Sequence, residues 1–298
     1  MKKILIATLL ILLVSSYPTT QATTINAAEK ASVKVVKKYY KGENMYAVIK
    51  PLFVDVYSGP GTSYKKIRKI KRFVHPVIVE KMSNGWYRVG YPGDEKHYID
   101  GKHVSKLVPD SKISEFIEPV RTFKKLSKKA PVPKTKVPSL KGKPTNNPET
   151  NLKMIGETLG FGLGAGRFDN DYSFAPNGTL AVSEYGKEVL TYNTNKVSEA
   201  FLDISSWDYP GVSEEEKLIP STVREILRFY YPTYYHELYT VIYNIAHEKN
   251  MDSYTEETFY LDNRQVRFHY SKHLGSLTVC IGKKGYKYNS GFHYRKKI

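Results

Sequence analysis

The chain has 298 residues, a formal net charge of +17 and one cysteine, Cys280. This length suggests two domains, and a single cysteine excludes an intramolecular disulfide. The charge is uneven, because residues 23–150 carry 27 Lys and Arg against 11 Asp and Glu, whereas residues 151–298 carry 17 against 18. A basic half joined to a nearly neutral half predicts that the first half meets an anionic partner.

The first 22 residues have the pattern of a secretory signal peptide. Lys2 and Lys3 precede an unbroken apolar run, residues 4–14, and Thr20-Gln21-Ala22 offers small residues for cleavage. The run is short for a bilayer span, and no later stretch approaches about 18 apolar residues. We therefore expect export, with membrane contact only through the signal before its cleavage. Outside a Gram-positive cell the abundant polyanions are teichoic acids and anionic lipid headgroups, so nucleic acid is not the expected partner.

Short β-strands dominate the region that follows a basic segment at 23–45. Residues 46–56 are rich in β-formers, and residues 75–82 alternate apolar and polar side chains. Ser83-Asn84-Gly85 supplies a tight hairpin turn, which leads into a partner strand at 86–93. A closing segment at 97–108 completes the pattern, which predicts a small, closed or nearly closed barrel.

The segment "DVYSGPGTSYKKIRKIKR" (55–72) joins a turn-rich loop to a dense run of positive charge. It is not a phosphate-binding loop of the Walker type, because Gly61 is followed by Thr62-Ser63-Tyr64 rather than by Gly-Lys-Ser/Thr and a helix. We expect Gly59 and Gly61 to supply unusual backbone angles, with Pro60 stiffening the loop between them.

"SGPGTSY" and, some twenty residues later, "NGWYRV" together resemble the bacterial Src-homology-3 (SH3) domain, the extracellular type found in cell-wall proteins. The resemblance covers residues 46–108. His97-Tyr98 stands where that family has a closing Trp, and Asp55-Val56-Tyr57 stands where it has Asn-Val-Arg. The resemblance implies an all-β barrel that binds peptidoglycan peptides or other wall components.

Two sets of candidate binding residues follow from this resemblance and from the charge. Tyr57 and Tyr64 flank the loop and are expected to be exposed contacts, whereas Trp86 fits the core better than a ligand platform. The candidate wall groove consists of Tyr57, Ser58, Gly59, Pro60, Gly61, Tyr64, Trp86 and Tyr91. The candidate patch for anionic polymer consists of Lys65, Lys66, Arg68, Lys69, Lys71 and Arg72. Lysines that protect an edge strand from pairing explain the same charges, and the two interpretations are compatible.

Residues 109–150 have the composition of a linker. The stretch "LSKKAPVPKTKVPSLKGKPTNNPET" (126–150) holds five prolines and six lysines. Proline removes backbone donors and keeps the chain extended, and the lysines repel one another. We interpret this region as a semi-extended, solvated tether, with room for a short helix within 111–126.

The second half, residues 151–298, reads as strands, then helices, then strands, which predicts an α+β domain. A Gly-rich start and Asn177-Gly178 mark strands and a hairpin. Two helices follow at 222–231, with Ser221 as cap, and at 234–250, with Thr233 as cap. Strands are expected at 258–270, with a turn at Asp262-Asn263, and at 275–282. One buried stripe is expected on the second helix, formed by Leu238, Val241, Ile242 and Ile245.

The second domain shows no intact catalytic or metal motif. His236-Glu237 begins like a zinc-protease motif, but Thr240 stands where the second histidine is needed. Cys280 lies within an apolar strand, which favours an inert core thiol over a nucleophile. Asp169 and Asp171 fit a calcium loop poorly, and carboxylates such as Glu199 carry little signal. No cofactor and no metal is therefore expected, and an enzyme is the less favoured class.

The sequence thus predicts an exported multidomain protein, held at a Gram-positive wall by its SH3-like barrel through peptidoglycan or teichoic acid. The α+β domain would bind an unknown ligand or partner. The alternative is a wall hydrolase whose second domain is an unrecognised catalytic domain, and a weaker one is a host-facing secreted factor. Oligomeric state stays open.

Overall fold

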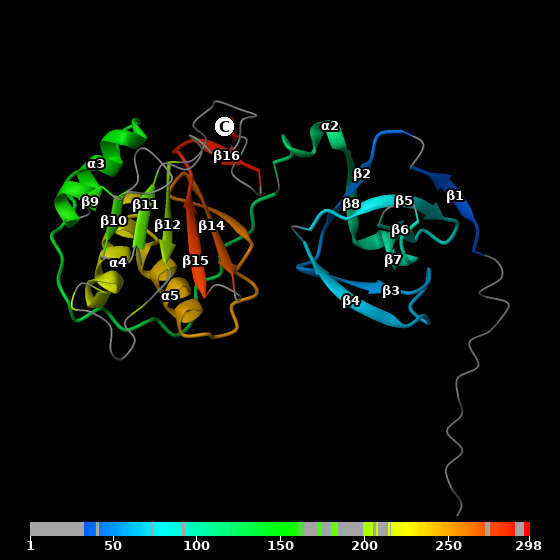
Figure 1. Ribbon diagram of the computed structural model, residues 1–298, viewed down its shortest axis with the longest axis horizontal. Helices are drawn as coiled ribbons and strands as arrows, with labels where there is room; N and C mark the ends of the chain where they lie inside the picture. The colour runs from blue at the N-terminus through cyan, green and yellow to red at the C-terminus, as the bar shows by residue number, and fades with distance from the viewer. Residues whose placement is uncertain are drawn as a thin grey trace, which may run out of the picture.

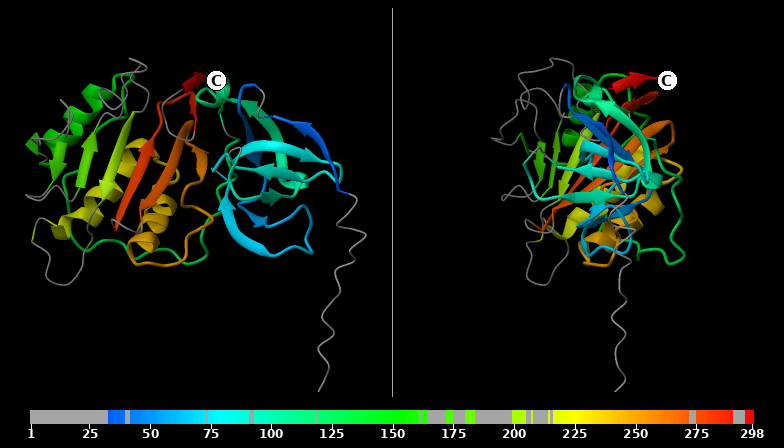
Figure 2. Two further views of the ribbon diagram at one scale, coloured as in Figure 1. Left: turned by 45° about the vertical axis from the view of Figure 1, so that its right-hand side comes forward. Right: turned by 90° about the vertical axis from the view of Figure 1, so that its right-hand side faces the viewer.

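The protein, described here from a computed structural model, forms two domains that lie side by side (Figure 1, Figure 2). The structure describes residues 33–39, 42–72, 74–90, 93–117, 119–160, 162–163, 172–174, 180–183, 199–204, 207, 214, 216–271, 275–289 and 295–298. The signal-like segment 1–22 lies outside these residues. In the described part of the chain, no helix is long and apolar enough to cross a membrane.

The first domain is an antiparallel sheet. Its strands follow the path β4-β3-β7-β6-β5-β2-β8, and β1 pairs with β5. The elements are β1 (Val35–Lys38), β2 (Met45–Ile49), β3 (Phe53–Tyr57), β4 (Lys66–Lys71), β5 (Val77–Met82), β6 (Tyr87–Val89), β7 (His97–Ile99), the 3-10 helix η1 (Gly101–His103), β8 (Val104–Pro109) and the short helix α2 (Asp110–Ile113). This confirms an SH3-like antiparallel sheet, whereas closure of the barrel stays a prediction.

Local sequence explains where these strands begin, end and face. The β-rich stretch at 46–56 forms two strands, β2 and β3, separated by a bend that contains Pro51, which lacks a backbone donor. Gly85 has a φ of 85° in the turn that joins β5 to β6, so the hairpin at Ser83-Asn84-Gly85 is confirmed. On β3, Val54 and Val56 alternate into the core, as a strand with one buried face requires.

The second domain is a sheet with helices packed on it. Among the described residues its strands follow the order β13-β14-β15-β12-β11-β10-β9, and each ladder is antiparallel. The elements are α3 (Pro148–Leu159), β9 (Gly162–Leu163), β10 (Tyr172–Phe174), β11 (Leu180–Ser183), β12 (Ala200–Ile204), η2 (Glu216–Leu218), α4 (Ile219–Tyr230), α5 (Tyr235–Ala246), β13 (Thr258–Leu261), β14 (Arg264–Ser271), β15 (Ser276–Ile281), β16 (Tyr286–Tyr288) and β17 (Arg295–Lys297). Side chains from the sheet and from the three helices share one core.

The two predicted helices exist, but their caps differ from the prediction. Helix α4 begins at Ile219 with a proline in its first turn, and the Ser221 hydroxyl inside it donates to Thr135 O at 2.8 Å instead of capping. Helix α5 has no side-chain cap, and the backbone N–H of Thr233 donates to Asp262. The apolar stripe is confirmed, since its four residues, Leu238, Val241, Ile242 and Ile245, are at most 2% exposed.

Helix α3 was not predicted. Its apolar residues Leu152, Ile155 and Leu159 are all buried in the domain core. Pro148 at its first position and Gly160, with a φ of 78°, just after its last are ordinary start and stop signals. Gly160 is therefore a helix terminator.

Residues 120–140, which we name the strap, are not a solvated tether. The strap runs along the second domain from the domain boundary toward α3 (Figure 1). Arg121 bridges to Phe259 beside edge strand β13, and Phe123 packs its ring 5.2 Å from that of Phe259. At the far end Leu140 is 2% exposed. The prolines keep the strap extended, as expected, but its spaced apolar side chains bury themselves against α4 and α5.

A buried ion cluster joins the two domains and the strap. Glu257, whose side chain is 3% exposed, lies 3.3 Å from both Arg72 of the first domain and Arg121 of the strap. Next to it, Lys71 Nζ donates to Thr255 O at 2.5 Å. Burial raises the pKa of Glu257, and the two arginines oppose that rise. The domains are therefore held in one arrangement by groups at the end of β4.

Candidate functional site

A groove of about 490 Å³ opens on the first domain, beside the turn-rich loop. Residues 60–64 of the loop form one wall, and Asn84 and Trp86 of the β5–β6 hairpin form the other. Val33 and Asp100 complete the lining. Four segments far apart in sequence thus meet at one concave place, as in a ligand site.

Hydrogen bonds hold the loop in this position. At its base, the Ser58 N–H donates to Lys65 O at 2.9 Å. At its tip, Asn84 Nδ2 donates to Pro60 O at 2.6 Å, which ties the hairpin to the loop. The groove is therefore fixed in shape before a ligand arrives.

The two loop glycines differ from what the sequence suggested. Neither Gly59 nor Gly61 has a positive φ. Instead, the Tyr64 ring lies against Gly59, where an added Cβ would come within 2.1 Å of it. At Gly61 the nearest atom to an added Cβ is 3.4 Å away, an ordinary contact. Gly59 is therefore required by close packing of Tyr64, which is itself part of the groove lining.

The aromatic candidates take different positions. Trp86 is 7% exposed and also lines the groove, so it is a core residue with one edge available to a ligand. Tyr57 is half-buried, with its ring edge-on to Trp86 at 5.3 Å, and supports the groove without lining it. Tyr64 is a lining residue, whereas Tyr91 lies outside the described residues.

Asp100 was missed by the sequence analysis. Its carboxylate caps η1 by accepting from the Lys102 N–H at 3.0 Å and pairs with Lys102 Nζ at 2.7 Å. Burial alone would raise the pKa of Asp100, but the hydrogen bonds from Lys102 outweigh it and hold the pKa below its usual value. The groove therefore contains an ionised carboxylate at neutral pH. An Asp just before Gly-Lys-His was the available signal, as a helix cap.

The predicted basic patch divides into two parts. Lys65, Lys66, Arg68 and Lys69 are exposed along edge strand β4, whose only ladder among the described strands is with β3. Lys66 pairs with Asp55 at 2.8 Å. Lys71 and Arg72 do not belong to this surface, because they contact the second domain. We use the name basic edge for Lys65, Arg68 and Lys69, which make no ion pair within the described structure.

The carboxylate and calcium candidates of the second domain are not supported as a site. Glu199 is fully buried, where Asn151 donates to it and Arg264 lies at 3.6 Å, and burial raises its pKa. It therefore serves the core and does not face a solvent-borne substrate. Asp169, Asp171, Gly164, Gly166 and Asn177-Gly178 lie outside the described residues.

Cys280 is expected to be chemically inert in the folded protein. It lies within β15 and packs against Tyr288, and burial raises the pKa of its thiol to about 12. Because the thiolate is the reactive form, iodoacetamide at pH 8 should label the native protein far more slowly than the urea-unfolded chain. Mass spectrometry over time measures both rates. Equal rates would show that the thiol is accessible and ionisable.

The comparison with known families agrees with the SH3-like sheet of the first domain. A family model described as "Bacterial SH3 domain" matches residues 53–105, which confirms the predicted resemblance for this domain. The match covers well under half of the 298 residues, so it classifies the first domain and not the whole chain. No curated protein and no solved structure matches the chain.

Proposed function

We propose that this protein is exported, with residues 1–22 as its signal peptide, and is retained at a Gram-positive cell wall by its SH3 domain. The observation that carries the proposal is the preformed groove built by residues 60–64, Trp86 and Asp100 in a bacterial SH3 domain, a wall-binding type of domain. We assign the groove to a peptide of peptidoglycan. The SH3 domain at 46–108 then anchors the protein to the wall. The domain at 151–298, together with the strap, is the part that this anchor holds at the wall.

The groove and the basic edge suit different ligands. Asp100 is already paired with Lys102, and an aromatic wall with fixed polar groups suits a peptide. The basic edge carries unpaired positive charge in an open position, which suits the phosphates of teichoic acid. Contacts of that kind weaken with salt, because the screening length is only about 8 Å at physiological ionic strength.

A pull-down of the full-length protein on purified Gram-positive walls tests whether the groove and the basic edge bind these different ligands. It is done with and without teichoic acid and across a salt series. We expect Gly59→Ala to lose the binding that persists at high salt, because its Cβ displaces Tyr64. Gly42→Ala, outside the groove lining, is the matched control and should bind as the native protein does, since an added Cβ there meets nothing within 4 Å.

The basic edge is tested in the same series by replacing Lys65, Arg68 and Lys69 with glutamine. That variant should lose only the salt-sensitive, teichoic-acid-dependent part of binding. Wall binding that is absent from the native protein, or that survives both sets of changes, would contradict the proposed function.

A further inference from the structure

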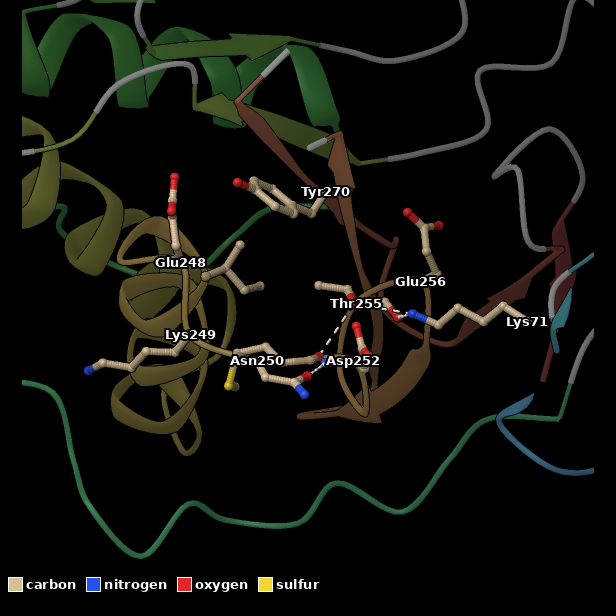
Figure 3. Close-up of a pocket in the computed structure, with 10 residues that line it drawn as sticks. Lys71, Glu248, Lys249, Asn250, Asp252, Thr255, Glu256 and Tyr270 are labelled. Atoms are coloured by element: carbon tan, nitrogen blue, oxygen red, sulfur yellow. Dashed lines mark hydrogen bonds between the residues drawn. The ribbon is translucent and has the colours of Figure 1, made fainter. Parts of the chain in front are cut away.

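A second cavity, of about 450 Å³, lies where the two domains meet. The end of β4 contributes Lys71, and the second domain contributes the end of α5, the loop after it and Tyr270 of β14. In Figure 3, Tyr270 lies between Glu248 on one side and Thr255 on the other, and Lys71 reaches in from the first domain. The second domain therefore forms most of the cavity, and Lys71 is the one lining residue from the first domain.

One side of this cavity is apolar. Ile245 and Met251 are 2% and 7% exposed, and Tyr270 packs partly against the domain core. These side chains offer an aliphatic and aromatic surface to a ligand. Apolar surface with a few polar groups at its rim is the usual make-up of a small-ligand site.

Some of the charged side chains around the cavity already have hydrogen-bond or ion-pair partners, and others have none. Glu256 accepts from Arg267 at 2.7 Å and also contacts His269. Lys71 donates to the carbonyl and hydroxyl oxygens of Thr255, and burial lowers the pKa of Lys71 despite nearby carboxylates.

Lys249 is engaged as well, and it faces away from the cavity. Its ammonium donates to Asn244 and lies 5.2 Å from the Tyr243 ring centroid. Glu248 and Asp252 are exposed and make no ion pair within the described structure. Glu248 and Asp252 are therefore the two lining carboxylates without an ion pair, whereas Lys71 keeps its charge because its hydrogen-bond partners are neutral.

The backbone at Glu248 supports a role for its side chain. Glu248 has a φ of 53° just beyond the end of α5, in the left-handed conformation that glycine adopts at such positions. The Lys249 N–H donates to Asn244 O at 3.0 Å, which completes the helix-ending turn. A glutamate here strains the backbone, and what it adds over glycine is a carboxylate at the cavity.

We propose that this interdomain cavity binds a primary ammonium carried on a short aliphatic chain, such as a lysine side chain of a peptide. Glu248 and Asp252 would accept hydrogen bonds from the ammonium, and the Tyr270 ring offers a cation–π contact. Ile245 and Met251 would contact the aliphatic chain. Lys71 closes the other end and repels a cation, which directs the ammonium toward Glu248.

Calorimetry on the full-length protein tests whether the cavity binds an ammonium. The probe is Nα-acetyl-lysine N-methylamide, and the control is its norleucine analogue, which lacks the charge. We expect the lysine probe to bind and the norleucine probe to bind much more weakly. Glu248→Gln combined with Asp252→Asn should weaken binding of the lysine probe by at least about tenfold. Glu115→Gln, an exposed acid elsewhere, should leave it unchanged.

Asp100→Asn separates this cavity from the groove of the SH3 domain, which also holds a carboxylate. Unchanged binding in Asp100→Asn supports the interdomain site. Three results would overturn the proposal: no binding of the lysine probe at millimolar concentration, equal binding of the norleucine probe, or loss of binding in Asp100→Asn with no loss in the double variant. None of these depends on whether the protein binds walls.

Discussion

Replacing Glu225 with alanine should lower the free energy of unfolding of the second domain by about 2 kcal/mol, because it leaves the buried Leu140 N–H without its acceptor. Glu225 Oε1 accepts from the Leu140 N–H at 2.6 Å, and Arg228 donates to both Glu225 and Leu140 O. This one carboxylate thus fastens the end of the strap to α4. Urea unfolding measures the loss, and trypsin should cut the freed strap after Lys134, Lys136 or Lys141 at low enzyme concentration.

The effect of Glu225 should depend on pH in a defined direction. Burial raises the pKa of Glu225, but hydrogen bonds from Arg228, Leu140 and Ser139 outweigh it and hold the pKa below its usual value of 4.5. The stabilisation is therefore fully present above about pH 4.5 and is lost as the pH falls through the lower pKa of the folded state. Native protein and Glu225→Ala should converge in stability in acid.

An exposed carboxylate on a neighbouring helix provides the control for Glu225. Glu157 pairs with Lys153 at 3.8 Å with both side chains largely exposed, so Glu157→Ala should change stability by less than about 1 kcal/mol. If Glu225→Ala unfolds at the same urea concentration as Glu157→Ala, the strap is held by its apolar side chains and not by this carboxylate.

The strap shows why composition misled the analysis of residues 109–150. Lysine and proline dominate that stretch, and both favour an extended, solvated chain in isolation. The deciding residues are the sparse apolar ones, Phe123, Leu126 and Leu140, whose spacing follows neither helical nor strand periodicity because it follows the core of the second domain on which they pack. When the spacing of apolar residues is set by the surface on which they pack, the sequence of the strap alone does not predict it.

Turns and stripes were predictable because their causes are local. Asp262 and Asn263 have φ of 48° and 61° in the turn between β13 and β14, as the sequence predicted. Residue types that tolerate this conformation are few, so the pattern identifies the turn. The apolar stripe on α5 and the SH3 loop motif were predictable for the same reason, because each depends on residues close together in the sequence.

The candidate sites were only partly predictable because sheet order assembles them. Pro60, Asn84 and Asp100 meet at the groove through strands that bring distant segments together. The basic run was predicted to form a surface patch, and Lys65, Arg68 and Lys69 are exposed, but Lys71 bonds to Thr255, 184 residues away. No local pattern distinguishes a lysine that faces solvent from one that docks a domain.

Glu257→Ala should separate the two domains. Glu257 is the buried carboxylate between Arg72 and Arg121, and its removal leaves arginines without a counter-charge, which costs about 3–5 kcal/mol at such sites. Small-angle X-ray scattering should then show a larger radius of gyration than that of the native protein.

A rescue variant distinguishes loss of the ion cluster from general unfolding. Replacing the whole cluster with apolar residues of similar size, Arg72→Met, Arg121→Met and Glu257→Leu, removes every unpaired charge, and such replacements are often neutral in stability. We expect this triple variant to scatter as the compact native protein does. If Glu257→Ala keeps the native radius, the Lys71–Thr255 bonds and the strap hold the domains together without the cluster. If the triple variant opens as widely as Glu257→Ala, the arginine–carboxylate geometry itself positions the domains.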